Sequence, residues 1–122
     1  MNQNKFNLEY SYDIETDSIF IKIINDYDYE ESIELEEGII LDFDKNGNPV
    51  ALEILDLSKL FAVDKSYFNH IDDIRMEVNI NHAINLKLKF CLSDNDKKCE
   101  QNFDTFVKNN VNLPEITTIA FC

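Results

Sequence analysis

Residues 39–55 constrain the fold of this chain more than any other segment, because two incompatible structures fit them. Read as a β-hairpin, the segment reverses at Asn46-Gly47 in a two-residue type I′ turn, and both strands alternate apolar and polar residues. The numbers of opposed residues then sum to 93, and six apolar side chains share one face, as cross-strand pairing prefers. These pairs are Phe43 with Val50, Leu41 with Leu52, and Ile39 with Ile54.

Read as a calcium loop, the same segment fits the pattern D-x-[DN]-x-[DN]-G-x5-E. The matching residues are Asp42, Asp44, Asn46, Gly47 and Glu53. Such a loop connects two helices, whereas both flanks here alternate with a period of two. We therefore interpret the segment as a hairpin and expect no cofactor. A divalent-cation module within residues 42–53, with Asp42, Asp44 and Asn46 as candidate metal ligands, remains the alternative.

Alternation elsewhere in the chain predicts a mainly β fold, on the border of α+β, built from antiparallel β-meanders. We expect loops at 25–31 and 109–114. The stretch 98–106 is a weaker strand, with a helical turn as its rival, because Phe103 breaks the alternation. The predicted strands are 5–12, 18–24, 32–36 (an edge strand), 38–44, 49–55, 74–80, 84–92, 98–106 and 115–121.

One or two short helices are expected at about 57–71. Asp56 is the predicted N-cap of a helix over 57–62, because its carboxylate can accept from the first free backbone amides. Asp64 is expected to cap a second short turn. In the polar turn before the second strand, Asp13 and Asp17 are expected to bond nearby backbone amides.

The length of 122 residues predicts a single domain, 1–122, with a core of its own. Within it we expect an N-terminal β module at about 5–64 and a C-terminal β-meander extension at about 72–122. No apolar run is long enough to span a membrane, and the N-terminus lacks the parts of a signal peptide.

The charge balance of 24 acids against 11 bases, a formal −13, argues against partners that carry phosphate. We expect no nucleic-acid and no membrane binding, and a basic protein as the candidate partner. A meander also leaves open sheet edges, which predicts a homodimer. Ile40, an apolar residue on the polar face of the hairpin, is a candidate partner contact.

The three cysteines, Cys91, Cys99 and Cys122, form no metal-binding spacing and suit a reducing cytoplasm. His70 and His82 are the only histidines, and both are expected at the surface. A Cys91–His82 pair is conceivable, but no motif positions it. We therefore predict no catalytic residue and a non-enzymatic protein, and keep an unrecognised hydrolase as a further alternative.

Two blocks of the sequence resemble a known family. Residues 12–21, YDIETDSIFI, resemble Tyr-Asp-x-Glu-x-Asp-x-Leu-Tyr-Ile. Residues 38–58 resemble a second block, which runs from a glycine through Asp-x-Asp to Glu-Ile-x-x-Ala-Ser. Together, over about residues 7–60, they resemble DUF2283, a small prokaryotic domain family of unknown function. The resemblance implies a short, soluble, β-rich protein without an established activity, and hints at an antitoxin-like role in binding a partner. This chain continues for some sixty residues beyond the second block.

Overall fold

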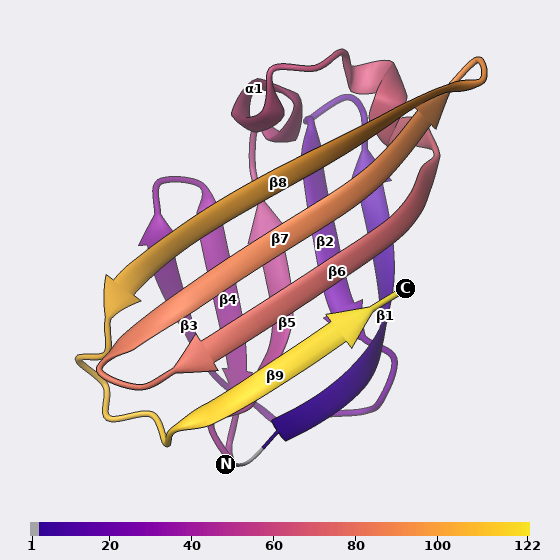
Figure 1. Cartoon of the computed structure of the whole chain (residues 1–122). Helices are drawn as coiled ribbons and strands as arrows, with labels where there is room; N and C mark the ends of the chain where they lie inside the picture. The colour runs from indigo at the N-terminus through magenta and orange to yellow at the C-terminus, as the bar shows by residue number, and fades with distance from the viewer. Residues whose placement is uncertain (1–2) are drawn as a thin grey trace.

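The computed structural model describes residues 3–122, and its fold is mainly β, as predicted (Figure 1). Nine strands form one mixed sheet in the order β3-β4-β5-β2-β1-β9-β6-β7-β8. One short α-helix and one 3-10 helix connect the two halves of the chain. The elements are β1 (Gln3–Asp13), β2 (Ser18–Ile23), β3 (Tyr29–Glu36), β4 (Ile39–Asp44), β5 (Pro49–Ile54), α1 (Leu57–Phe61), η1 (Lys65–Asn69), β6 (Ile71–Ile80), β7 (Ala83–Asp94), β8 (Lys97–Lys108) and β9 (Ile116–Phe121).

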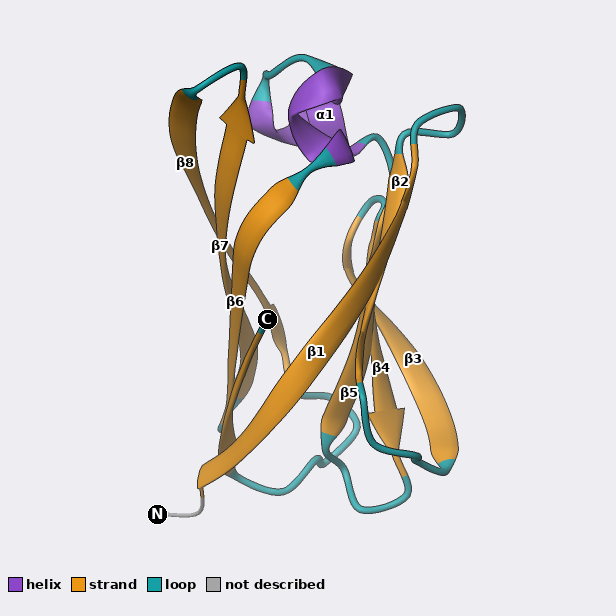
Figure 2. Cartoon of the chain, turned by 90° about the vertical axis from the view of Figure 1, so that its right-hand side faces the viewer, coloured by secondary structure: helices purple, strands orange, loops and turns teal. Residues whose placement is uncertain are grey.

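The sheet curls so that β2–β5 and β6–β9 face each other as two layers, and β1 passes from one layer to the other (Figure 2). Residues 3–7 of β1 pair in parallel with β9, and residues 8–13 pair antiparallel with β2. This parallel pair is the one departure from the predicted antiparallel pairing. Among residues 3–122 it is the only ladder that joins the two layers directly.

The predicted hairpin at 39–55 is present, and its six inward side chains are all buried. The predicted turn is wrong in detail. Asn46 is not among the residues with positive φ, and the amide of Asp44 bonds the carbonyl of Asn48 at 3.0 Å, which makes a three-residue loop. Phe43 therefore pairs with Pro49, and a bulge at Val50 restores the predicted register from Asp42 onward.

Gly47 suits this loop for two reasons. Its φ is +79°, and a Cβ at this position would lie 2.7 Å from the Cδ of Pro114. The hairpin end of one layer therefore packs tightly against the loop that leads into β9. A two-residue turn with positive φ at both positions does occur in the chain, but at Asn95-Asp96 between β7 and β8.

The two halves are not simple meanders. In the second half β6, β7 and β8 follow one another, and β9 then returns to pair with β6, which is the Greek key order. The predicted loop at 25–31 is wrong at its end, because β3 begins at Tyr29. The helical rival for 98–106 is also wrong, because β8 is a twelve-residue strand.

The core lies between the layers, and α1 and η1 close it at one end (Figure 2). Phe61 of α1 packs edge-to-face on Phe90 of β7, with ring centroids 5.3 Å apart, and Phe68 of η1 contacts both rings. The prediction that Asp64 caps the second turn is confirmed, because its carboxylate accepts from the Ser66 amide at 2.9 Å. None of the helices in the described part of the chain is long and apolar enough to span a bilayer.

Candidate functional site

A buried carboxylate joins the two sequence blocks that resemble the family. Asp17 is 4% exposed and has a φ of 55°. Its Oδ1 accepts from the Tyr12 hydroxyl at 2.6 Å, and its Oδ2 accepts from the Ser58 hydroxyl at 2.7 Å. The Ser58 amide also donates to it at 3.1 Å, and the Leu57 amide donates to the Asp17 carbonyl at 2.9 Å. Asp17 therefore fixes the first turn of α1 from the β1–β2 turn.

This arrangement corrects the predicted helix cap. Asp56 has a left-handed backbone and makes no capping side-chain bond, whereas Asp17 supplies the capping carboxylate. The prediction for Asp13 holds, because its carboxylate accepts from the Glu15 amide at 2.9 Å. The sequence led us to expect that Asp17 bonds amides of its own turn, and that prediction is wrong. The signal for its true role was that Asp17 lies in one family-like block and Ser58 in the other.

The hydrogen bonds to Asp17 set its ionisation. Burial alone raises the pKa of Asp17, but the bonds from Tyr12 and Ser58 outweigh burial and hold that pKa below its usual value. Burial and the adjacent carboxylate raise the pKa of Tyr12. A carboxylate with a lowered pKa is a weaker proton acceptor, so these bonds favour a structural role over activation of the Ser58 hydroxyl. The network is suited to holding α1 in place.

Two of the three candidate metal ligands, Asp42 and Asp44, accept hydrogen bonds within the protein. Asp44 Oδ1 accepts from the amides of Asn46 and Asn48, both at 2.9 Å, and so closes the hairpin loop. Asp42 accepts from the Ser32 hydroxyl at 2.6 Å. Among residues 3–122 no group of three or more His, Cys, Asp or Glu side chains is placed to hold a metal ion.

An acidic segment, residues 26–37, borders this hairpin loop. It carries seven acids and no base, and it includes the edge strand β3. The Lys45 amide donates to the Asp28 carbonyl at 3.1 Å, which holds the segment against the loop. Between them lies a shallow pocket of about 310 Å³, lined by Asp26, Tyr27, Asp28, Asp44, Lys45 and Asn46. Three carboxylates against one lysine leave this recess negatively charged, and with the Tyr27 ring it can receive a cationic side chain.

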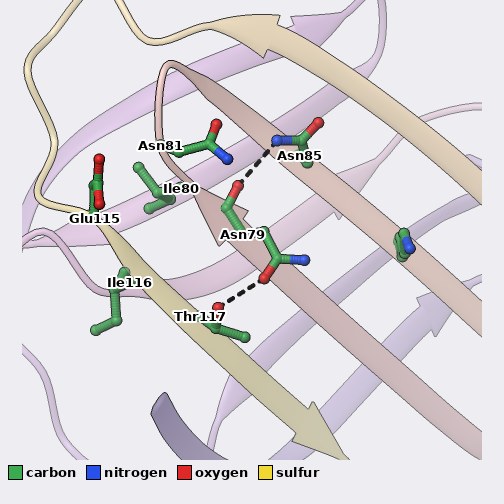
Figure 3. Close-up of a pocket in the computed structure, with 8 residues that line it drawn as sticks. Asn79, Ile80, Asn81, Asn85, Glu115, Ile116 and Thr117 are labelled. Atoms are coloured by element: carbon green, nitrogen blue, oxygen red, sulfur yellow. Dashed lines mark hydrogen bonds between the residues drawn. The ribbon is translucent and has the colours of Figure 1, made fainter. Parts of the chain in front are cut away.

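A larger groove, about 740 Å³, lies on the outer side of β6, β7 and β9 (Figure 3). Its polar groups bond one another: the Thr117 hydroxyl donates to Asn79 Oδ1 at 2.8 Å, and Asn85 donates to the Asn79 carbonyl at 3.3 Å. Lys87 and Glu115 are its ionisable residues. An amide oxygen is no general base, so the Thr117–Asn79 bond does not make a nucleophile.

The remaining predicted residues lie apart. His82 and His70 are exposed, and His70 lies 3.0 Å from Asp72. Cys91 and His82 lie at opposite ends of β7, roughly 30 Å apart along the strand, so they form no pair. Cys91 and Cys99 are on adjacent strands but on opposite faces, and all three cysteines are free. Ile40 is half-buried on the outer face, between Glu34 and Glu53.

Comparisons with known proteins give a family and no activity. Residues 9–58 match the family described as "Protein of unknown function (DUF2283)". The chain is 35% identical, over 93% of its length and 92% of the relative's, to a Methanosarcina mazei protein named "Putative hypoxanthine phosphoribosyltransferase". It is 41% identical over 59 residues to an uncharacterized protein of Methanocaldococcus jannaschii, covering 37% of this chain and half of that one. No solved structure matches.

Proposed function

The chain belongs to the DUF2283 family of proteins of unknown function, and from that premise we propose that it is a non-catalytic binding module for a basic protein. The observation that carries the proposal is the pocket formed by the acidic segment and the β4–β5 loop. Such a module can neutralise its partner by covering a basic surface, as an antitoxin does.

Electrostatics supports a basic partner. A protein with a formal charge of −13 attracts cations over its whole surface, and the acidic segment concentrates that attraction along one edge. A lysine or arginine side chain entering the pocket meets Asp26, Asp28 and Asp44 beside the Tyr27 ring. Complementary charge of this kind chiefly increases the rate of association and the selectivity for partners.

The name of the Methanosarcina relative implies an activity for which this chain shows little equipment. Transfer of a phosphoribosyl group needs a site that holds phosphate, commonly a glycine-rich loop or a helix N-terminus. This chain has two glycines, Gly38 and Gly47, and both lie in turns between strands. Its α1 has five residues, too short for such a site. The groove of Figure 3 offers amides, one hydroxyl, Lys87 and Glu115, so a single cationic side chain is available there to hold phosphate.

We further propose that the protein works as a cytoplasmic homodimer. Three unpaired cysteines suit a reducing compartment. The sheet has two edge strands, β3 and β8, and an unpaired edge favours association with another strand.

Calorimetric titration with a lysine-rich peptide tests the binding proposal. We expect binding that weakens as salt is added, because exposed charges are screened. Asp26→Asn and Asp28→Asn should each lower the affinity by up to about fivefold, since an exposed ion pair contributes roughly 0.2–1 kcal/mol. Glu115→Gln removes the same charge outside the acidic segment and should change little. If all three variants lose affinity equally, the peptide responds to net charge alone and the pocket is not its binding site. Titration with Ca²⁺ is the control for a metal site.

A further inference from the structure

The two edge strands, β3 and β8, form no ladder with each other, although the Thr105 hydroxyl of β8 donates to Glu36 of β3 at 2.7 Å, and the two edges differ in how they are protected. β3 has eight residues, two register shifts against β4 and several glutamates, all of which discourage pairing with a second copy. β8 has twelve residues in one unbroken register with β7, and it contains no proline. We propose that a second copy of this chain pairs antiparallel with β8, about a two-fold axis that passes through Gln101. This inference rests on the proposed homodimer and adds its edge and register.

The side chains of β8 alternate between two faces. Odd-numbered residues share the inner face, since Phe103 pairs with Leu88 and Thr105 pairs with Leu86 in the core. Even-numbered residues from 98 to 108 point outward and are exposed. Opposed residues in an antiparallel pair lie on the same face, so their numbers must sum to an even value in a symmetric dimer.

Among the registers in which at least nine residues of β8 overlap with the partner strand, charge favours one. In the register whose opposed residue numbers sum to 202, Lys98 lies opposite the partner's Asp104, and the two-fold axis repeats this pair. Glu100 then lies opposite the partner's Asn102. The neighbouring registers each oppose like charges, which is destabilising. A sum of 200 sets Glu100 against itself, 204 sets Glu100 against Asp104, and 206 sets Lys98 against Lys108. A sum of 208 pairs Glu100 with Lys108 but sets Asp104 against itself, whereas 202 gives its two opposite-charge pairs without a like-charge pair.

Apolar contacts agree with the same register. On the inner face, half-buried Cys99 lies opposite the partner's Phe103. On the outer face, Phe106 is 69% exposed and is the most exposed large apolar residue of the described chain. It falls diagonal to the partner's Lys98, whose methylene stem can cover the ring.

Sedimentation equilibrium on the full chain and four charge variants tests the register. We expect the native protein to be a dimer, and Lys98→Glu and Asp104→Lys each to weaken dimerisation by at least about tenfold, because symmetry applies each change twice. The double variant K98E/D104K should restore the dimer. Lys97→Glu, with the same charge change one residue away, should have little effect. A native dimer that is indifferent to the swaps would overturn this register and leave self-association standing, whereas a native monomer would overturn both.

Cross-linking gives a second measurement that does not depend on charge. The Gln101 residues face each other across the axis, and opposed Cα atoms in an antiparallel pair are about 4.5–5.5 Å apart, within disulfide range. In a chain with its native cysteines replaced by serine, Gln101→Cys should form a disulfide dimer on mild oxidation, and Lys108→Cys should not. Equal cross-linking at both positions, or none at Gln101, would contradict the proposed axis.

Discussion

Asp17 holds the amide and the hydroxyl of Ser58 through its carboxylate, although the two residues lie 41 positions apart in the chain. Tyr12 completes the network from β1. The bond ties the β1–β2 turn to the start of α1, and α1 carries Phe61 onto Phe90 in the facing layer. The two family-like sequence blocks therefore meet at one buried carboxylate, which positions the helix that closes the core.

The first prediction concerns this cap. Asp17→Asn should lower the free energy of unfolding by about 2 kcal/mol, because charge-assisted hydrogen bonds contribute roughly 1.5–3 kcal/mol. Asp56→Asn is the matched control, because the Asp56 side chain makes no capping bond and Asn tolerates the left-handed backbone. The free energy of unfolding of this variant should fall by no more than about 0.5 kcal/mol. Urea denaturation measures both. Equal losses would show that Asp17 is not the cap.

The second prediction is a pH dependence. The folded pKa of Asp17 lies below its unfolded value, so its contribution to stability is present above that value and is lost as pH falls through the folded pKa. We expect the unfolding free energy to drop below about pH 4. The drop should be shallower in Asp17→Asn, as followed by denaturation at several pH values. An identical acid slope in both proteins would contradict the low pKa.

The third prediction concerns Thr118 in β9. Its side chain is fully buried, and its Oγ1 has no hydrogen-bond partner within the described chain. A buried hydroxyl without a partner carries a desolvation penalty of about 1–3 kcal/mol. Thr118→Val keeps the shape and removes the hydroxyl, so it should raise the unfolding free energy by about 1 kcal/mol. Thr117→Val, which removes the hydroxyl bonded to Asn79, should not stabilise the protein.

The fourth prediction is that residues 1–122 fold as one unit, as the sequence led us to expect. Inward residues of the hairpin, such as Leu41 and Phe43, share one core with Ile84 and Phe90 of the facing layer. A fragment of residues 1–64 leaves that apolar face without its cover, so it should show no cooperative thermal transition by circular dichroism. A fragment that melts cooperatively would mean that the two halves are separate domains.

The sequence predicted what depends on local alternation. The faces of β4 and β5 followed from a period of two, because a slip by one residue would expose Leu41 and Leu52. The Phe43–Pro49 pair was missed, because a bulge adds one residue without changing the composition of either strand. The Asp17 cap and the β1–β9 pair were missed because both join distant segments, and alternation within a strand does not name its partner.

The proposed binding site is tested most directly by residue-resolved NMR, with a lysine-rich peptide titrated into the isotope-labelled native chain. We predict amide shifts concentrated at residues 26–31 and 44–46, around the pocket beside the β4–β5 loop. Shifts that are spread evenly over the acidic surface, or that centre on the groove of β6, β7 and β9, would contradict it.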